Sequence, residues 1–349
     1  MLRTPKYKVI NMTINMNLSD DSYDIIVERN IIKNANKYLN LDRRVLIVTD
    51  SGVPAQYAKT IAGTCKESVI CTLEEGEGSK SLEAFGMLLQ TMLNHGFSRK
   101  DLVVAVGGGV VGDLSGFAAS AYMRGIDFYN IPTTLLSQID SSIGGKTAIN
   151  FGGVKNTVGA FYQPKKVLID PELLKTLPAR QISNGLAEAI KMALTSDKEL
   201  FEIFETRDIE SSLDEIIVRS LNIKKSVVEQ DEKETGLRKI LNFGHTIGHG
   251  IESSEGMCEL YHGECVALGM IPMCSDSVRH RLTRVLEKCN LCRKIEYDWE
   301  KIAEAAFHDK KADGGKVTVT TVNEIGSFEM KTMDCRDVIE LAKDALEGF

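Results

Sequence analysis

The sequence lacks the features that would place a protein in or across a membrane. No apolar run approaches the roughly 20 residues that an α-helix needs to cross a bilayer. The N-terminus, MLRTPKYKVINMTINMNLSD, has no continuous apolar h-region of the kind that secretory signal peptides carry. We therefore expect a cytoplasmic protein that has no contact with a membrane.

Cysteine is sparse, and positive charge is not in excess. The 8 cysteines are too thinly spread over 349 residues for a disulfide scaffold, so reduced thiols are the simpler interpretation. Cys289 and Cys292 form a lone CxxC, without the second pair that a structural zinc site needs. The 42 Lys and Arg against 49 Asp and Glu give a net charge of −7, which disfavours binding to nucleic acid through overall charge.

What the chain does contain is a normal globular balance, with 43% hydrophobic and 26% charged residues. At roughly 100–200 residues per domain, its length predicts two domains, each large enough to bury a core. We found no internal repeat and no low-complexity tract.

Residues 1–176 predict an α/β domain with a parallel sheet. Apolar runs without in–out alternation are separated by segments of helical pattern, as a parallel sheet covered on both faces requires. The predicted strands are Val45–Val48, Ser68–Leu73, Leu102–Val106, Ile126–Ile131 and Val167–Ile169, and the predicted helices are Val53–Thr64, Ser79–His95 and Val110–Met123.

Residues 177–349 predict an all-α domain, and Pro178 is a plausible helix start. Apolar residues recur at spacings of three and four in the predicted helices, which are Ser183–Glu205, Leu213–Glu229 and Asn242–Ser253. Only Val317–Val322 and Ile325–Met330 resemble strands, and they suggest a late hairpin.

A strand that runs directly into glycines suggests a dinucleotide site. Leu102–Val106 leads into GGGVVGD at Gly107–Asp113, which satisfies the G-x-G-x-x-G pattern. Bare backbone N–H groups at such a helix start can approach a pyrophosphate. However, the turn does not belong to the first βα unit, where this fingerprint usually lies, and a purely structural tight turn gives the same string.

Three charged residues nearby fit a nucleotide, although a cap or a solvated charge is the alternative for each. Asp50 ends a predicted strand, where its carboxylate can accept ribose hydroxyls, and Glu77 and Lys80 lie in a loop that enters the next helix. Gly144–Thr147 resembles part of a P-loop, but Asp140 stands where that motif needs glycine, so we exclude a P-loop.

The histidines suggest a metal. His245, His249 and His262 fall within eighteen residues, and a helix starting near Asn242 would align the first two with Asn242 on one face. If the helix reaches back far enough, Arg238 shares that face. His-x-x-x-His is a metal-ligand spacing, but it lacks the glutamate of the zincin motif, and such a pair can also be a structural accident. Catalytic zinc usually takes three protein ligands. The acidic candidates for the third are Asp140, Glu188, Glu234 and Glu264.

Lysines in unexpected places suggest an anionic substrate. Lys224 lies on an apolar stripe with Leu221 and Val228, where a lysine is costly unless it reaches water or binds an anion. Glu188 and Lys191 share a helix face at i and i+3, which is ordinarily a surface pair. Taken together, these residues predict a cation-rich polar cavity that can hold a metal.

Several long strings resemble 3-dehydroquinate synthases, which belong to the sugar phosphate cyclase family. They are GGGVVGD (Gly107–Asp113), YMRG (Tyr122–Gly125), IPTTLLSQIDSSIGGKTAIN (Ile131–Asn150), GAFYQP (Gly159–Pro164), NGLAEAIK (Asn184–Lys191), LNFGHTIGHG (Leu241–Gly250) and HGECVA (His262–Ala267). The resemblance implies a dehydroquinate synthase-like fold, with a Rossmann-like NAD-binding domain followed by a helical metal- and substrate-binding domain. It also implies NAD, a divalent metal (Zn²⁺ or Co²⁺) and a homodimer.

The resemblance also implies roles for individual residues. The metal ligands match Glu188, His245 and His262, so that His249 faces the site without binding the metal. NAD contacts match Asp50, Glu77, Lys80, Gly108, Gly109, Val110, Asp113, Thr133, Thr134, Leu136, Asp140, Lys155 and Thr176. Substrate contacts match Lys146, Asn156, Lys191, Lys224, Arg238, Asn242, His249 and one of Lys310 and Lys311. Glu234 and His249 match the proton-transfer pair, and Arg124 would reach the neighbouring subunit's phosphate pocket.

The reaction that this implies converts 3-deoxy-D-arabino-heptulosonate 7-phosphate to 3-dehydroquinate and phosphate, in the shikimate pathway. It runs through transient oxidation at C5, phosphate elimination, re-reduction and an intramolecular aldol closure, so that NAD is regenerated in each turnover. The alternatives are another sugar phosphate cyclase, such as a 2-deoxy-scyllo-inosose or valiolone-type synthase, and a metal-dependent polyol dehydrogenase. A degenerate binding protein would have lost a ligand or Lys191, and neither is lost.

The sequence departs from the family pattern at three places. Gly52 stands where the family often has asparagine, which puts one ribose contact in doubt. The loop at residues 151–154 lacks the usual Pro and Gly pattern before Lys155 and Asn156. The family's lysine aligns with either Lys310 or Lys311, which differ by one position.

Overall fold

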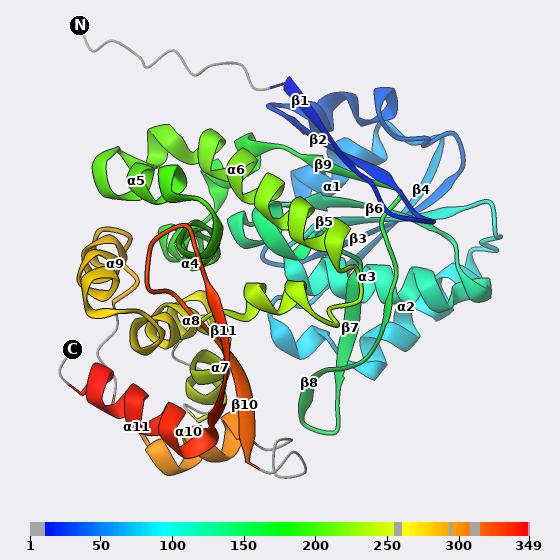
Figure 1. Ribbon diagram of the computed structural model, residues 1–349. Coiled ribbons are helices and arrows are strands. Elements are labelled where there is room, and N and C mark those ends of the chain that lie inside the picture. The colour runs from blue at the N-terminus through cyan, green and yellow to red at the C-terminus, as the bar shows by residue number, and fades with distance from the viewer. Residues whose placement is uncertain (1–10, 255–259, 293–295, 308–314, 348–349) are drawn as a thin grey trace, which may run out of the picture. The chain divides into compact units, whose positions relative to one another are not determined.

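The computed structural model describes residues 11–254, 260–292, 296–307 and 315–347 (Figure 1). Contacts within the chain divide it into two compact units, Met1–Pro178 and Ala179–Phe349, which we call unit 1 and unit 2. None of the described helices is long and apolar enough to span a membrane. The cysteines in the described ranges are all free.

Unit 1 is built on a seven-stranded sheet in the order β1-β2-β9-β6-β5-β3-β4. The strands are β1 (Asn11–Met16), β2 (Tyr23–Glu28), β3 (Arg44–Asp50), β4 (Glu67–Leu73), β5 (Leu102–Gly107), β6 (Asp127–Pro132) and β9 (Lys166–Ile169). Only β1 runs antiparallel to its neighbour. The five predicted strands are confirmed, and β1 and β2 are additional.

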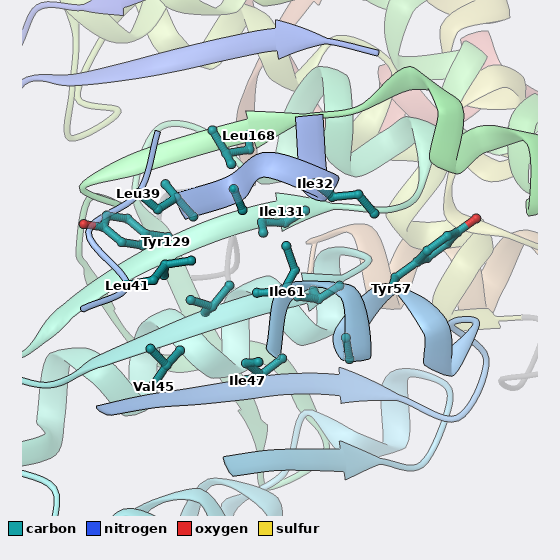
Figure 2. Packing of buried hydrophobic residues seen from close by; sticks show 14 of the residues in the cluster. Ile32, Leu39, Leu41, Val45, Ile47, Tyr57, Ile61, Tyr129, Ile131 and Leu168 are labelled. Atoms are coloured by element: carbon teal, nitrogen blue, oxygen red, sulfur yellow. The ribbon is translucent and has the colours of Figure 1, made fainter. Parts of the chain in front are cut away.

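Helices and short turns cover both faces of this sheet. They are η1 (Ile31–Lys37), α1 (Ala55–Ala62), η2 (Glu77–Ser79), α2 (Leu82–Asn94), α3 (Gly109–Ala121), η3 (Tyr122–Arg124), the π-helical turn η4 (Ser137–Ser141) and η5 (Pro171–Thr176). Alternate residues of β3 show why the strands carry unbroken apolar runs. Val45 and Ile47 pack towards α1 and η1 in the cluster of Figure 2, whereas Leu46 and Val48 pack into the opposite core with residues of α2 and α3.

The strand order reverses between β3 and β5. From β3 the chain adds β4 on one side, then returns to place β5 on the other side and continues to β6. In open parallel sheets, ligands bind at the carboxyl ends of the strands beside such a switch point. Here those ends carry Asp50 and Gly107.

A separate hairpin, β7 (Lys146–Phe151) and β8 (Val154–Phe161), lies outside the main sheet of unit 1. Apolar runs did not predict it, because β8 is exposed along nearly its whole length and needs no buried face. The strand β7 packs against α3, with Ile149 in the core between them.

Unit 2 is helical, with one hairpin. Its elements are α4 (Ala179–Ser196), α5 (Lys198–Thr206), α6 (Ile209–Gln230), η6 (Leu237–Asn242), α7 (His245–Ser254), α8 (His262–Met270), η7 (Ile271–Met273), α9 (Asp276–Lys288), α10 (Trp299–Phe307), β10 (Lys316–Thr321), β11 (Glu329–Asp334) and α11 (Cys335–Leu346). The predicted late hairpin exists, although its second strand begins four residues later than predicted.

Two predicted helices of unit 2 have different bounds in the structure. The segment Ser183–Glu205 forms two helices, because the Asp197 side chain accepts a hydrogen bond from the Leu200 backbone N–H and so starts α5. The helix predicted from Asn242 begins three residues later, since α7 starts at His245.

Candidate active site

Four side chains of unit 2 converge on one point. Glu188 Oε1 lies 3.6 Å from His245 Nε2 and 3.4 Å from His262 Nε2. One ligand atom from each of His245, His249 and His262 lies within 4.8 Å of the others. The two carboxylate oxygens of Glu188 are buried and accept no hydrogen bond of good geometry from the described residues. Two imidazole nitrogens around an unsatisfied carboxylate form a donor set that suits Zn²⁺ or Co²⁺.

The two outer nitrogens of these histidines are held in place by acceptors. His245 Nδ1 lies 3.2 Å from the Phe243 carbonyl oxygen, and His262 Nδ1 lies 3.3 Å from Glu252 Oε2. A proton on Nδ1 satisfies each acceptor, so that Nε2 of both rings faces Glu188. Such outer partners fix the tautomer and orientation of metal-binding histidines. The sequence reasoning missed Glu252, although it follows His249 by three residues on the same helix.

Electrostatics favour a charged Glu188 beside a neutral His245. Burial raises the pKa of Glu188, but Lys191, His245 and His262 outweigh it and hold that pKa well below its ordinary value. Burial and the Lys191 charge hold the pKa of His245 well below its ordinary value. Burial lowers the pKa of His262, but its contacts with Glu188 and Glu252 outweigh this and raise it to about 9.

Glu188 and Lys191 do not form a surface pair. Both lie on α4, each is 1% exposed, and the Lys191 ammonium forms an ion pair with Glu188 Oε2. Burying both charges is costly unless other groups compensate them. A buried pair that abuts two imidazoles is therefore typical of a functional site.

Glu264 was one of the acidic candidates for a metal ligand, and the structure excludes it. Its carboxylate accepts two hydrogen bonds from Arg180, of 2.9 and 2.7 Å, and a third from the backbone N–H of Tyr261 at 2.8 Å. The bond to Tyr261 is part of the capping box that starts α8, so Glu264 fixes the place of His262 at the first position of that helix.

The predicted stripe of Arg238, Asn242, His245 and His249 on one continuous helix is wrong. Gly244 breaks the helix, because its φ of 79° lies outside the helical range. Only glycine fits there, since a Cβ would lie 2.6 Å from Met270 Cγ and 2.9 Å from the Val266 carbonyl oxygen. The break lets α7 pack closely on α8. His245 and His249 still share a face of α7, with ring centroids 5.1 Å apart.

A loop organised by Asp231 carries the predicted proton-transfer residue Glu234. The Asp231 carboxylate accepts hydrogen bonds from the backbone N–H groups of Thr235 (2.9 Å), Gly236 (2.7 Å) and Arg238 (3.0 Å). These donors, Arg238 first, hold the pKa of Asp231 below its ordinary value. The sequence reasoning gave Asp231 no role, because its contacts arise only once this loop has folded.

Asn242 and Lys224 also take definite places in unit 2. Asn242 Nδ2 donates to Glu234 Oε1 at 2.8 Å, which orients that carboxylate. Glu234 has a left-handed backbone with φ of 60°, which is uncommon outside glycine. Lys224 lies on α6 and is 5% exposed, so it does not extend to bulk solvent.

In unit 1, Asp50 and the glycine turn, both predicted to bind NAD, lie at the switch point. Asp50 Oδ1 accepts the backbone N–H groups of Gly52 (2.9 Å) and Val53 (3.1 Å), and Oδ2 has no hydrogen bond among the described residues. Burial raises the pKa of Asp50. At Gly52, where the family often has asparagine, a Cβ would lie 2.5 Å from Glu75 Cδ, so the Glu75 side chain fills that space.

The glycine turn is open at the start of α3. Gly108 precedes the helix and offers no side chain to cap the first backbone N–H groups, while Gly109 and the half-buried Val110 form its first turn. A helix N-terminus without a cap suits an anion such as a pyrophosphate. A Cβ at Gly108 would lie 3.1 Å from Thr134 Cγ2, so the turn lies tightly against the end of β6.

The segment after β6 holds four more of the predicted NAD contacts. Thr133 donates its backbone N–H to the Gly107 carbonyl oxygen at 2.9 Å, and the Thr134 hydroxyl accepts the Ser137 N–H at 3.2 Å. The half-buried Leu136 and Asp140 lie at and within the π-helical turn η4. Such π turns are frequent at functional sites.

The remaining predicted residues of unit 1 lie on the hairpin, on α3, and in or directly after 3₁₀ turns. Lys146 and Lys155 are exposed on β7 and β8, and the Thr176 hydroxyl pairs with the Tyr57 hydroxyl at 2.8 Å. One contact network joins Lys80 to Glu77, Asp113 and Asn156.

Arg124 lies in a strained and exposed turn. Met123 and Arg124 have φ of 49° and 68°, two successive non-glycine residues in the left-handed region. Both side chains are exposed in the middle of the Tyr122–Gly125 string. Lys310 and Lys311 lie outside the described residues.

Family comparisons cover most of the chain. The model for the 3-dehydroquinate synthase N-terminal domain matches residues 70–184, and that for the C-terminal domain matches residues 185–312. A protein of Sulfurovum sp. (strain NBC37-1) named 3-dehydroquinate synthase is 42% identical in an alignment of 343 positions that covers 94% of this chain and 95% of that protein. The chain belongs to the 3-dehydroquinate synthase family.

Solved structures of related sugar phosphate cyclases share the 3-dehydroquinate synthase fold with this chain. A 2-deoxy-scyllo-inosose synthase complexed with carbaglucose-6-phosphate, NAD⁺ and Co²⁺ has a TM-score of 0.87 and 26% identity, covering 96% of this chain and 100% of its own. The 2-epi-5-epi-valiolone synthase of Streptomyces hygroscopicus subsp. jinggangensis 5008, with NAD⁺ and Zn²⁺ bound, has a TM-score of 0.86 and 29% identity, covering 95% and 98%. The predicted Rossmann-like domain with a helical domain is thereby confirmed.

Proposed function

We propose that this chain is a 3-dehydroquinate synthase, a carbon–oxygen lyase that converts 3-deoxy-D-arabino-heptulosonate 7-phosphate to 3-dehydroquinate and phosphate. The observation that supports this most directly is the buried carboxylate of Glu188, which faces the Nε2 atoms of His245 and His262 and pairs with Lys191. A cation-rich metal site in an acidic protein suits a substrate that carries a carboxylate and a phosphate.

We assign Glu188, His245 and His262 as the metal ligands. Their fit rests on the buried carboxylate of Glu188, whose oxygens accept no hydrogen bond of good geometry from the described residues, and on the two imidazoles that present Nε2 towards it. A bound Zn²⁺ or Co²⁺ would supply a Lewis acid for the reacting hydroxyl of the substrate. The exposed His249 is left for proton transfer, together with Glu234.

NAD would supply a reversible hydride acceptor. We assign its pyrophosphate to the uncapped start of α3 and its ribose hydroxyls to Asp50, whose Oδ2 is free to accept. The other residues assigned to NAD are Glu77, Lys80, Asp113, Thr133, Thr134, Leu136, Asp140, Lys155 and Thr176.

The other polar residues of the candidate site bind the substrate's anionic groups or move protons. We assign Lys146, Asn156, Lys191, Lys224, Arg238 and Asn242 to binding, together with one of Lys310 and Lys311. Asn242 donates to Glu234 Oε1 and so orients the carboxylate that we assign to proton transfer. A polyol dehydrogenase, whose substrate is neutral, has no use for so many cations.

We also propose a cytoplasmic homodimer in which Arg124 reaches the partner's phosphate pocket. The exposed, strained turn at Met123 and Arg124 supports this, since strained backbone is retained mostly where function needs it.

His262→Ala tests the assignment of the site. The variant should lose bound metal and turnover, because one of three protein ligands is gone, while it still binds NAD through unit 1. Metal content, turnover and NAD titration are measured on the same preparation. Undiminished turnover in the metal-depleted variant would refute the role of His262.

A further inference from the structure

Lys80 is a buried lysine whose ammonium joins two segments of unit 1. The residue is 4% exposed and follows η2 directly. Its Nζ donates to Asp113 Oδ2 on α3 at 2.7 Å, and it also donates to Asn156 Oδ1 on β8. Glu77 Oε1 is 3.9 Å away, beyond a direct hydrogen bond. The Asp113 carboxylate therefore balances the lysine charge, and the contact with Asn156 is additional.

The chemistry of this contact fixes which way the Asn156 amide points. An ammonium carries three donors and no acceptor, whereas an amide offers an oxygen acceptor on one side and an NH₂ donor on the other. Lys80 can therefore engage only Oδ1, and Nδ2 must point to the opposite side. Asn156 is exposed, and its Nδ2 has no hydrogen-bond partner in the described ranges. The side chain thus presents N–H donors outward.

A second set of hydrogen bonds fixes the backbone of Asn156. Its N–H donates to Asn150 Oδ1 at 2.9 Å, and Asn150 Nδ2 donates to Glu77 Oε1 at 2.8 Å. The Asn150 N–H also donates to the Lys80 carbonyl oxygen at 2.7 Å. With the backbone of Asn156 held at φ of 55°, a region that asparagine tolerates, its side-chain amide is the main freedom left. The lysine removes that freedom too.

We propose that Lys80 is a positioning residue that orients the Asn156 amide so that its N–H donors face an oxyanion of the substrate. This rests on the proposed function, in which Asn156 contacts the substrate. Without the ammonium, the amide can turn its oxygen outward and repel the same oxyanion. Lys80 acts here through Asn156 and does not need to touch the substrate.

The test is a double-mutant cycle read out by binding of inorganic phosphate to the enzyme loaded with NAD and zinc. Lys80→Met removes the donor, and Asn156→Gly removes the amide while accepting the left-handed backbone. Each should weaken phosphate binding by about 10- to 100-fold, the range for one hydrogen bond to a charged group. Because the two residues act as one unit, the double variant should bind phosphate no more weakly than either single variant.

Two conservative variants separate orientation from mere structural support. Lys80→Arg keeps a donor-only side chain and should retain most of the affinity for phosphate. Asn156→Asp keeps a partner for Lys80 but has no outward donor, so it should bind phosphate at least as weakly as Asn156→Gly. Since Asn156 is exposed, this variant tests the idea even if Lys80→Met does not fold. Lys165→Met is the control, because Lys165 pairs with Asp21 at the surface of the same unit, with Nζ and Oδ1 2.8 Å apart.

Several results would overturn the proposal. They are additive effects of the two substitutions, unchanged phosphate affinity in Lys80→Met or Asn156→Asp, and no phosphate binding by the wild-type enzyme at millimolar concentration. NAD affinity is titrated separately, because Lys80 also contacts Asp113. The variants could bind phosphate as the double-mutant cycle predicts while the wild-type enzyme does not turn over the heptulosonate phosphate. That result would refute the proposed function and leave the positioning role intact.

Discussion

Glu252→Gln should weaken metal binding without removing a ligand. Glu252 Oε2 lies 3.3 Å from His262 Nδ1, and the Nε2 of the same ring lies 3.4 Å from Glu188 Oε1. The carboxylate thus orients the ring and increases its basicity as a donor. A glutamine keeps the shape, but it carries no charge and can turn its NH₂ group towards Nδ1.

The expected magnitude follows from this geometry. Loss of an outer carboxylate partner typically lowers metal affinity by 10- to 100-fold, or about 1.4–2.7 kcal/mol. The metal-free protein is titrated with Zn²⁺ in competition with a chromophoric chelator at neutral pH. The affinity for NAD should not change, because its assigned residues lie in unit 1.

Glu304→Gln is the matched control, since Glu304 is exposed on α10 and has no contact with the histidines. It removes the same charge from the same unit. Equal zinc affinities for Glu252→Gln and the wild-type protein would show that Glu252 does not support His262, and equal losses in both variants would point to net charge alone.

Two further predictions concern the loop after α6 and the turn after α3. Asp231→Asn should lower kcat by about 100-fold, the lower range for general acid–base catalysis, and leave the KM for NAD unchanged, because Glu234 loses its place. Backbone donors lower the pKa of Asp231, so its stabilising effect on the loop is present above the ordinary carboxyl pKa of about 3.9. The effect is lost only as the pH falls below that value. A wild-type loop that loosens above pH 5 in hydrogen exchange would contradict this. Arg124→Ala should be inactive alone, and it should regain activity in mixed dimers with inactive His262→Ala subunits. No recovery would show that Arg124 does not act across an interface.

The sequence predicted those parts of the fold that local pattern determines. Four of the five predicted strands, β3, β5, β6 and β9, can be predicted because they are buried on both faces and are mostly apolar. The edge strand β4 carries an apolar run although it is only partly buried. The hairpin of β7 and β8 was not, since an exposed polar strand resembles a loop. The helix break at Gly244 depends on how closely α7 approaches α8, which no single segment encodes.

The residues of the candidate site could likewise be predicted from the sequence only in part. Spacing brought His245 and His249 together, but it could not choose among four acidic residues. Hydrogen bonding decides between two of these, which are both buried. The Glu188 oxygens accept no hydrogen bond of good geometry from the described residues, whereas Arg180 holds Glu264. Glu252 could have been found as the next residue on the histidine face of α7, whereas Asp231 acts only through contacts that folding creates.

The measurement that tests the central claim most directly is phosphate release from 3-deoxy-D-arabino-heptulosonate 7-phosphate with zinc and a catalytic amount of NAD, while absorbance reports NADH. We predict phosphate in large excess over NAD, no accumulation of NADH, and 3-dehydroquinate as the product. Absence of phosphate release from the metal-loaded, NAD-binding protein, or NADH formed stoichiometrically from a simple polyol, would contradict the account.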